Sequence, residues 1–289
     1  MQLRTSCWLI LLLSTLPAYA DPILGSAGIF AILGGSDVTN TGPTTLNGDL
    51  GVYPGTSITN TNGITINGVV YGGSAVPPNN AGAATAEGDA TAARLGLGAM
   101  PVTTNLTGEN LGGLTLTPGV YGFDSSAGLT GTLTLNGEGN PNALWVFVTG
   151  STLTTASGPG AAAINVINAG SGSNDGIFWD VGSSATLGSY TSFEGNILAS
   201  DSITLDTGAS IGCGSALASR GAVTMDANTV SAGCNGGGTM TDGLVTPVSS
   251  MSVVPEPHSL VLLGTGLAGL LLLVFSQRAE TKLRPHLRS

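Results

Sequence analysis

A short repeat is the feature that most restricts what this chain can fold into. An apolar residue between small polar ones, followed by glycine or another small residue, returns at intervals of 18–20 residues. A period of this length is typical of a solenoid, in which each repeat packs only on its neighbours. The central apolar residues of the segments that share this form are Leu46, Ile66, Phe193, Ile211 and Val230.

These equivalent residues of successive repeats form one rank, and two further ranks repeat with the same spacing. Leu187, Leu205 and Met225 each follow a threonine, and a third rank comprises residues 177–179, 196–198 and 215–217. Three short strands per repeat describe a three-sided coil with glycines at its corners. An antiparallel sandwich would also contain short strands and turns. The fixed period favours a mainly β, three-faced parallel β-solenoid, that is, a β-helix.

Residues 79–99 break this pattern because they are rich in alanine and contain no proline. We expect a helix from near Asn80 to the glycines before Pro101, packed along one side of the solenoid. Residues 111–123 are typical of a strand pair around the turn at Pro118-Gly119.

The first 20 residues have the pattern of a secretory signal peptide. Arg4 precedes an apolar stretch at residues 8–13, and Ala18-Tyr19-Ala20 forms a cleavage site before Asp21. The alternative is an uncleaved membrane anchor, but the apolar stretch is short for spanning a bilayer. We therefore expect export.

The C-terminal residues carry a second targeting pattern. Pro255, Glu256 and Pro257 precede an apolar stretch at residues 260–275 and a basic tail. A plain C-terminal membrane anchor would share the last two features. The three features in this order resemble the PEP-CTERM sorting signal, which implies processing by an exosortase and delivery to the cell surface. This gives a signal peptide at 1–20, a solenoid domain at 21–238, a linker at 239–254 and a sorting signal at 255–289.

The chain between these ends is strongly acidic. Residues 21–254 hold fifteen acidic residues and only two bases, Arg94 and Arg220, so their net charge is −13. This charge argues against nucleic acid as a partner, and it leaves membrane contact to the C-terminal segment before processing.

The same region contains no lysine, and both histidines, His258 and His286, lie in the sorting signal. Polysaccharide-cleaving chemistry needs a suitable base or paired carboxylates. A carboxylate pair between neighbouring coils and calcium at aspartate turns remain alternatives, but we expect no enzyme, no cofactor and no metal site.

Two cysteines, Cys213 and Cys234, remain once Cys7 leaves with the signal peptide. In an exported chain they predict one disulfide, which would stabilise the fold by about 3 kcal/mol. Two buried free thiols are the alternative.

Hydroxyl side chains accompany the first apolar rank. Because neighbouring strand residues point to opposite faces, the residue before each inward apolar one points outward. These residues are Thr45, Thr65, Ser192, Ser210 and Thr229, and Ser189 and Thr207 predict a second file. Coils stack about 4.7–4.9 Å apart, close to oxygen repeats in ice. Thr and Ser are also common on exposed strands for ordinary reasons.

Several longer runs resemble the microbial ice-binding-protein family with a discontinuous β-solenoid. They lie at residues 33–42, 45–55, 111–121, 150–158 and 193–199. The resemblance implies a right-handed three-faced solenoid with one long α-helix alongside, whose N-terminal coils stack into the C-terminal part. It implies ice as the partner, with antifreeze, recrystallisation-inhibiting or ice-adhesion activity. The family's Thr-Ala/Gly-x-Thr/Asn motif is best matched at residues 207–210. A non-enzymatic structural or adhesive matrix protein on the same scaffold is the alternative.

Overall fold

The computed structural model describes residues 23–60, 63–72, 80–140, 143–169 and 176–232, which all belong to one compact unit. The predicted signal peptide, linker, sorting signal with its apolar stretch at 260–275, and Cys234 lie outside these residues. Within the described ranges, no helix is long and apolar enough to cross a membrane.

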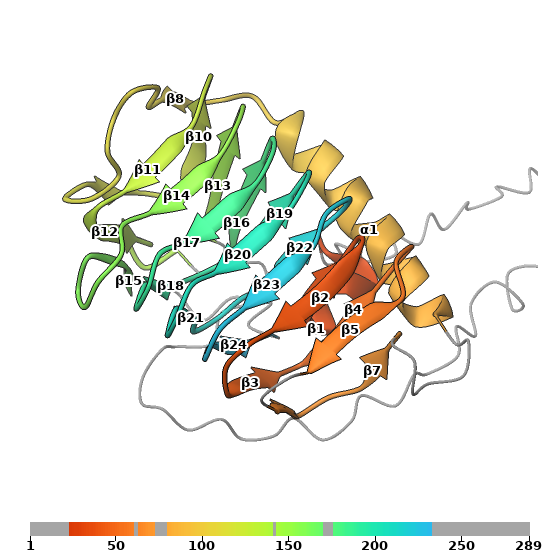
Figure 1. Ribbon diagram of the computed structural model, residues 1–289. Helices are drawn as coiled ribbons and strands as arrows, with labels where there is room; N and C mark the ends of the chain where they lie inside the picture. Colours follow the sequence, from red (N-terminus) through yellow and green to blue (C-terminus); the bar gives the residue numbers. More distant parts are fainter. Residues whose placement is uncertain (1–22, 61–62, 73–79, 141–142, 170–175, 233–289) are drawn as a thin grey trace, which may run out of the picture. The chain divides into compact units, whose positions relative to one another are not determined.

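Three parallel sheets form the sides of a solenoid (Figure 1). Sheet A has the order β7 (Val70–Tyr71), β4 (Asp49–Val52), β1 (Phe30–Gly34), β22 (Ala216–Ala218), β19 (Asn196–Ala199), β16 (Gly176–Val181), β13 (Leu144–Thr149), β10 (Gly119–Phe123), β8 (Thr104–Asn105). Sheet B has the order β11 (Ala127–Leu129), β14 (Leu153–Thr155), β17 (Ala185–Leu187), β20 (Ile203–Leu205), β23 (Val223–Met225), β2 (Asp37–Asn40), β5 (Ser57–Asn60). Sheet C has the order β6 (Ile64–Ile66), β3 (Thr44–Asn47), β24 (Thr229–Ser231), β21 (Ser210–Ile211), β18 (Ser192–Phe193), β15 (Ala162–Ile167), β12 (Gly131–Asn136), β9 (Thr115–Leu116).

Each apolar rank of the sequence falls in one sheet, so the three-faced solenoid is confirmed and the antiparallel sandwich is wrong. The third rank needs a shift of one residue, because Trp179 pairs with Ile197 rather than Leu198. Trp179 and Ile197 are both fully buried and belong to the core. That shared burial sets the register.

The strand pair predicted at residues 111–123 is wrong in its pairing. β9 joins sheet C beside β12, whereas β10 joins sheet A beside β13. The turn at Pro118 is therefore a corner of the coil between two sheets, not a hairpin.

The stack is discontinuous in sequence. β1, β2 and β3 pair with β22, β23 and β24, so the first coils of the chain continue from the last (Figure 1). The seam is a normal part of the core, since Leu46 pairs with Val230 and Val38 with Val223, all four fully buried.

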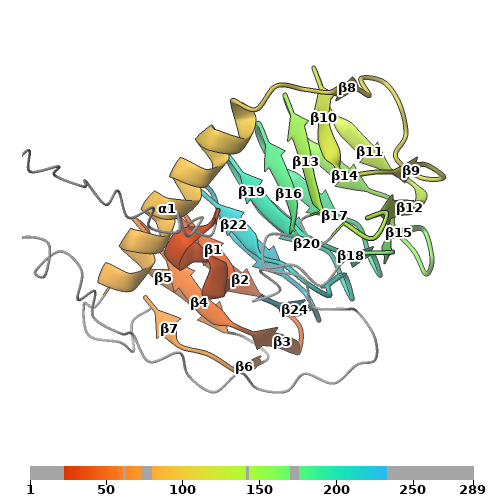
Figure 2. The same ribbon diagram turned by 180° about the vertical axis from the view of Figure 1, so that it is seen from behind.

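Sheet A is apolar on both faces because a helix covers its outer side. Inside, Tyr121, Phe147 and Trp179 stack in succession, with Phe147 and Trp179 ring centroids 3.8 Å apart. Outside, α1 (Ala81–Gly98) runs along the sheet from the β7 end toward the β8 end (Figure 2). Its buried residues are Ala83, Ala86, Ala90, Ala93 and Leu97. Small alanines let the helix lie close to the sheet, and the predicted helix along one side of the solenoid is confirmed.

Candidate functional site

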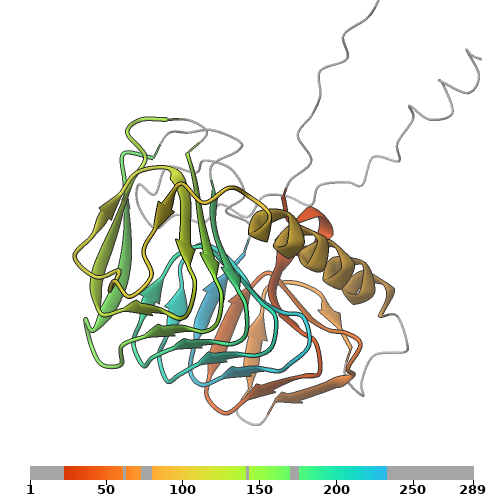
Figure 3. The same cartoon turned by 90° about the horizontal axis from the view of Figure 1, so that it is seen from above.

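Helices cover the outer face of sheet A. The outer faces of sheets B and C are therefore the sides available for a partner. The short helix η1 (Gly25–Ile29) packs with α1 against sheet A (Figure 3). The partly buried ion pair between Arg94 and Asp180, 3.7 Å apart, ties α1 to β16. Burial raises the pKa of the Asp180 carboxyl, and the nearby guanidinium of Arg94 partly opposes this.

Sheet C carries the predicted hydroxyl file in register. Its order along the stack is Ser192, Ser210, Thr229, Thr45 and Thr65. All five side chains are partly or fully exposed. Beyond Ser192 the file continues with an alanine, Ala163, which lacks a hydroxyl. We call these five residues the sheet C file.

Amide side chains run beside the sheet C file and bond to one another. The amide nitrogen of Asn67 donates to the Asn47 side-chain oxygen at 2.8 Å, and that of Asn47 donates to the Ser231 hydroxyl at 3.0 Å. These three polar side chains thus form hydrogen bonds with one another.

Ser189 and Thr207 do not lie on the sheet C file. They occupy the corner where the chain passes from sheet B to sheet C, and the Thr207 hydroxyl donates to the Asp226 carboxylate. Tyr190 next to them has φ +61°, is 55% exposed and lies over Gly208, where a Cβ would come within 2.8 Å of the Tyr190 ring. The predicted second file is therefore a corner, interrupted by a bulky ring.

Sheet B carries a longer and more uniform file that sequence reasoning missed. Six threonines are in register on consecutive strands, which we call the sheet B file: Thr154, Thr186, Thr204, Thr224, Thr39 and Thr59. The signal was present in the sequence, because Thr186, Thr204 and Thr224 precede the apolar rank Leu187, Leu205 and Met225.

A second, less regular column precedes the sheet B file by two residues. Thr152, Ser184, Ser202 and Ser57 belong to it, and Ala222 and Asp37 interrupt it. The Thr152 hydroxyl donates to that of Ser126 at 2.8 Å. Within the described part of the chain, the hydroxyls of Thr154, Thr186, Thr204, Thr224 and Thr59 have no protein hydrogen-bond partner and are left for water.

One buried acid lies at the corner where the chain passes from sheet C to sheet A. Glu194 follows β18, is 9% exposed, and its Oε2 has no hydrogen-bond partner. Burial raises the pKa of Glu194 to about 7, although the backbone N–H of Cys213 donates to the carboxylate and lowers it. Cys213 is itself disulfide-bonded. Its pairing with Cys234 stays a prediction, since Cys234 is outside the described residues.

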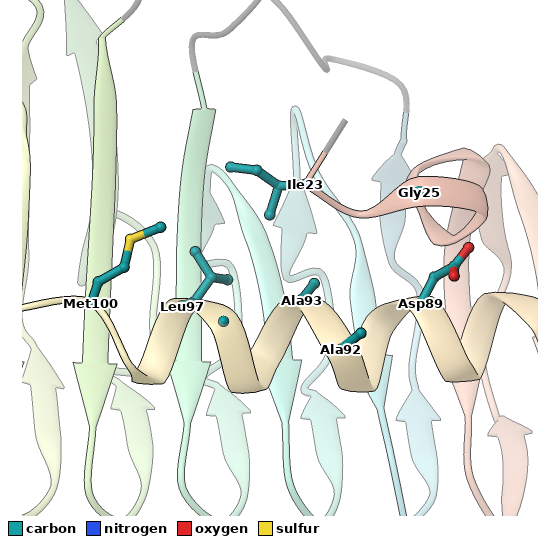
Figure 4. Close-up of a pocket in the computed structure, with 8 residues that line it drawn as sticks. Ile23, Gly25, Asp89, Ala92, Ala93, Leu97 and Met100 are labelled. Carbon is teal, nitrogen blue, oxygen red and sulfur yellow. The ribbon is translucent and has the colours of Figure 1, made fainter. Parts of the chain in front are cut away.

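A cavity of about 680 Å³ lies between η1 and α1 (Figure 4). Small or apolar residues and one acid, Asp89, line it, and Asp89 accepts hydrogen bonds from the backbone N–H and hydroxyl of Ser26 at 2.8 and 2.6 Å. The lining offers no second acid, base or nucleophile. Among the described residues, no cluster of three or more His, Cys, Asp or Glu could hold a metal ion.

Comparison with known proteins identifies the family to which this chain belongs. The family model for ice-binding-like domains matches residues 32–231. The chain belongs to the ice-binding-like family. A second model, for the PEP-CTERM protein-sorting motif, matches residues 253–278, which suggests secretion or cell-surface localisation.

Relatives in this family cover the described domain. An ice-binding protein of Nostoc sp. is 48% identical over 250 residues, which are 86% of this chain and 85% of the relative. A solved ice-binding protein from an Antarctic biological consortium is 40% identical with a TM-score of 0.65, covering 80% of this chain and 95% of that one. A solved ice-binding protein from the ascomycete Antarctomyces psychrotrophicus is 39% identical with a TM-score of 0.65, covering 73% and 97%.

Proposed function

We propose that this protein binds ice through the outer face of sheet B. The observation that carries this proposal is the sheet B file itself, six threonines in register on six consecutive strands. The ice-binding-like family and relatives named as ice-binding proteins support the same partner.

The geometry suits a crystal surface. Neighbouring strands place the threonines about 4.7–4.9 Å apart, and the column two residues earlier adds a second row about 7 Å away along the strand. Each threonine presents a methyl and a hydroxyl. Among the described residues, Thr39 is the one member of the file whose hydroxyl has a protein partner, the Asp37 carboxylate at 3.3 Å, so water can order against most of the face without displacing protein hydrogen bonds. Affinity then comes from many weak contacts on a rigid surface that loses little entropy on binding.

The sheet C file is the second candidate, favoured by its five in-register hydroxyls: Ser192, Ser210, Thr229, Thr45 and Thr65. It is shorter, mixes serine with threonine, and lies beside amides that bond to one another. Ser189 and Thr207 would belong to its margin. These differences make sheet B the better ice face.

In this proposal the protein is not an enzyme. Targeting signals at both ends of its chain bring it to the cell surface. A signal peptide at residues 1–20 would start export, and an exosortase-type enzyme would process the motif at Pro255, Glu256 and Pro257. The acidic domain would then stay soluble outside the cell, facing ice. A structural role in an extracellular matrix is the alternative, and it predicts no effect on ice.

Two matched substitutions separate these possibilities. Thr204→Tyr and Ser210→Tyr place the same bulky ring in the middle of the sheet B and sheet C files, respectively. We expect Thr204→Tyr to remove at least nine-tenths of the thermal hysteresis and ice-recrystallisation inhibition, and Ser210→Tyr to leave most of both. Circular dichroism would check that both variants fold.

The reverse result would assign ice binding to sheet C. Equal activity in both variants would place the ice face elsewhere. Absence of ice shaping by the folded wild-type protein would contradict ice binding and favour the matrix role.

A further inference from the structure

One carboxylate lies on the outer face of sheet B. The seven strands that the structure describes for this sheet consist of apolar, hydroxyl, amide and glycine residues, with Asp37 at the start of β2 as the single charged exception. Val38 is fully buried, so alternation along β2 directs Asp37 and Thr39 outward. The Asp37 side chain is only partly buried. A charge therefore stands among the side chains proposed to face ice.

Asp37 belongs to the less regular column that precedes the sheet B file by two residues. β2 lies between β23 and β5 in the sheet (Figure 1). The neighbours of Asp37 in the column are Ser57, with which it is in register, and Ala222, which directly precedes β23. Neither neighbour carries a charge that could balance the carboxylate.

The bonds of Asp37 reach the sheet B file itself. Its two carboxylate oxygens accept hydroxyl hydrogens from Ser36 at 2.6 Å and from Thr39 at 3.3 Å. The two ion pairs among the described residues involve other acids, Asp180 and Asp201, so no cation neutralises Asp37 there. Because Thr39 is a member of the sheet B file, the carboxylate alters both columns on β2.

A carboxylate and a hydroxyl order water differently. A hydroxyl both donates and accepts, as a water molecule in ice does, whereas an ionised carboxylate only accepts. Removing water from a charge is also far more costly than removing it from a neutral hydroxyl. Water around Asp37 therefore turns its hydrogens toward the carboxylate, and this arrangement interrupts an ice-like layer over the threonines.

Asp37 divides the sheet B file into two unequal parts. On one side lie four threonines of consecutive strands, whose hydroxyls have no protein partner in the described part of the chain: Thr154, Thr186, Thr204 and Thr224. On the other side only Thr59 remains, on the edge strand β5.

We propose that Asp37 limits the ice-contact surface to β14, β17, β20 and β23, so that β2 and β5 contribute little to ice binding. This inference rests on the proposed function, because it concerns the extent of the same face. Neutralising Asp37 would extend the surface over six strands. Affinity would rise, since each added contact belongs to a surface that is already ordered.

The first experiment removes the charge. Thermal hysteresis of the full chain, purified as an exporting bacterial host processes it, would be compared at equal concentration. We expect Asp37→Ser, which places a hydroxyl in the column, to raise it about twofold. Asp37→Asn keeps an acceptor for Ser36 and Thr39 and should give a smaller gain. Glu138→Gln, which removes one negative charge from an exposed turn after β12 of sheet C, should change nothing.

The second experiment tests the boundary without altering Asp37. Thr154→Tyr and Thr59→Tyr place the same ring at the two ends of the sheet B file, where both threonines are exposed. We expect Thr154→Tyr to lose most of the thermal hysteresis and Thr59→Tyr to retain most of it. Combining Thr59→Tyr with Asp37→Ser should cancel the gain, because the ring then lies on the extended surface. A purely structural role of Asp37 would not couple it to Thr59.

The outcomes separate this inference from the proposed function. Equal losses in Thr59→Tyr and Thr154→Tyr, or unchanged hysteresis in folded Asp37→Ser and Asp37→Asn, would overturn the boundary and leave sheet B as the ice face. Retained activity in Thr204→Tyr would contradict the proposed function and the boundary with it. Circular dichroism would check the fold of each variant, and if the Asp37 variants fail to fold, the two tyrosine variants decide.

Discussion

Glu194 is the residue whose burial has the clearest consequence for stability. Its folded-state pKa of about 7 exceeds the ordinary value of 4.5 because burial disfavours the carboxylate. Between these two pH values the folded protein holds more protons than the unfolded chain, so the free energy of unfolding falls as pH rises. The full effect is about 3 kcal/mol, present as added stability below about pH 4.5 and lost above about pH 7.

Replacing Glu194 with glutamine should therefore flatten the pH dependence of stability. We expect Glu194→Gln to be more stable than wild type at pH 8 and to lack most of the decline between pH 5 and 8, as measured by urea unfolding. Glu138→Gln, at an exposed site, is the control for loss of one negative charge. If Glu194→Gln declines with pH as steeply as wild type, the carboxyl is not protonated in the folded protein.

Helix α1 shows how glycines within one element can have opposite effects. A Cβ at Gly88 would meet nothing within 4 Å, whereas at Gly82 it would clash with the Tyr71 ring. Alanine stabilises a helix interior by about 0.5–1 kcal/mol relative to glycine where space allows. We expect Gly88→Ala to raise the free energy of unfolding by this amount and Gly82→Ala to lower it, both by urea titration. A gain in both variants would mean that Tyr71 moves freely.

The elements differ in how far the sequence could predict them. Strands and the helix followed from side-chain periodicity and alanine content, because those patterns act locally. The pairing of β9 and β10 did not follow, since a Pro-Gly turn is equally suited to a hairpin or a coil corner. The full sheet B file could not be predicted from the repeat alone, because Thr39 and Thr59 join Thr224 only across the seam between distant parts of the chain. The burial of Glu194 depends on distant strands, which no local pattern contains.

At the scale of the whole molecule, the seam between β24 and β3 decides whether the solenoid behaves as one unit. The N-terminal coils pair with the last coil along all three sheets, so strands from the two ends of the described sequence meet there. Leu46 is fully buried beside Val230 at this seam. Trp145 and Trp179, both buried, lie on the other side of the seam, in coils formed by the C-terminal part.

Leu46→Ala should consequently destabilise coils that it does not belong to. Truncating a buried leucine costs about 2–5 kcal/mol. If the stack unfolds cooperatively, this loss shifts the urea midpoint of tryptophan fluorescence as far as that of circular dichroism. Thr45→Ala, an outward-pointing neighbour, should change the free energy of unfolding by no more than about 0.5 kcal/mol. A fluorescence midpoint that stays at the wild-type value while circular dichroism shifts would show that the N-terminal coils unfold by themselves.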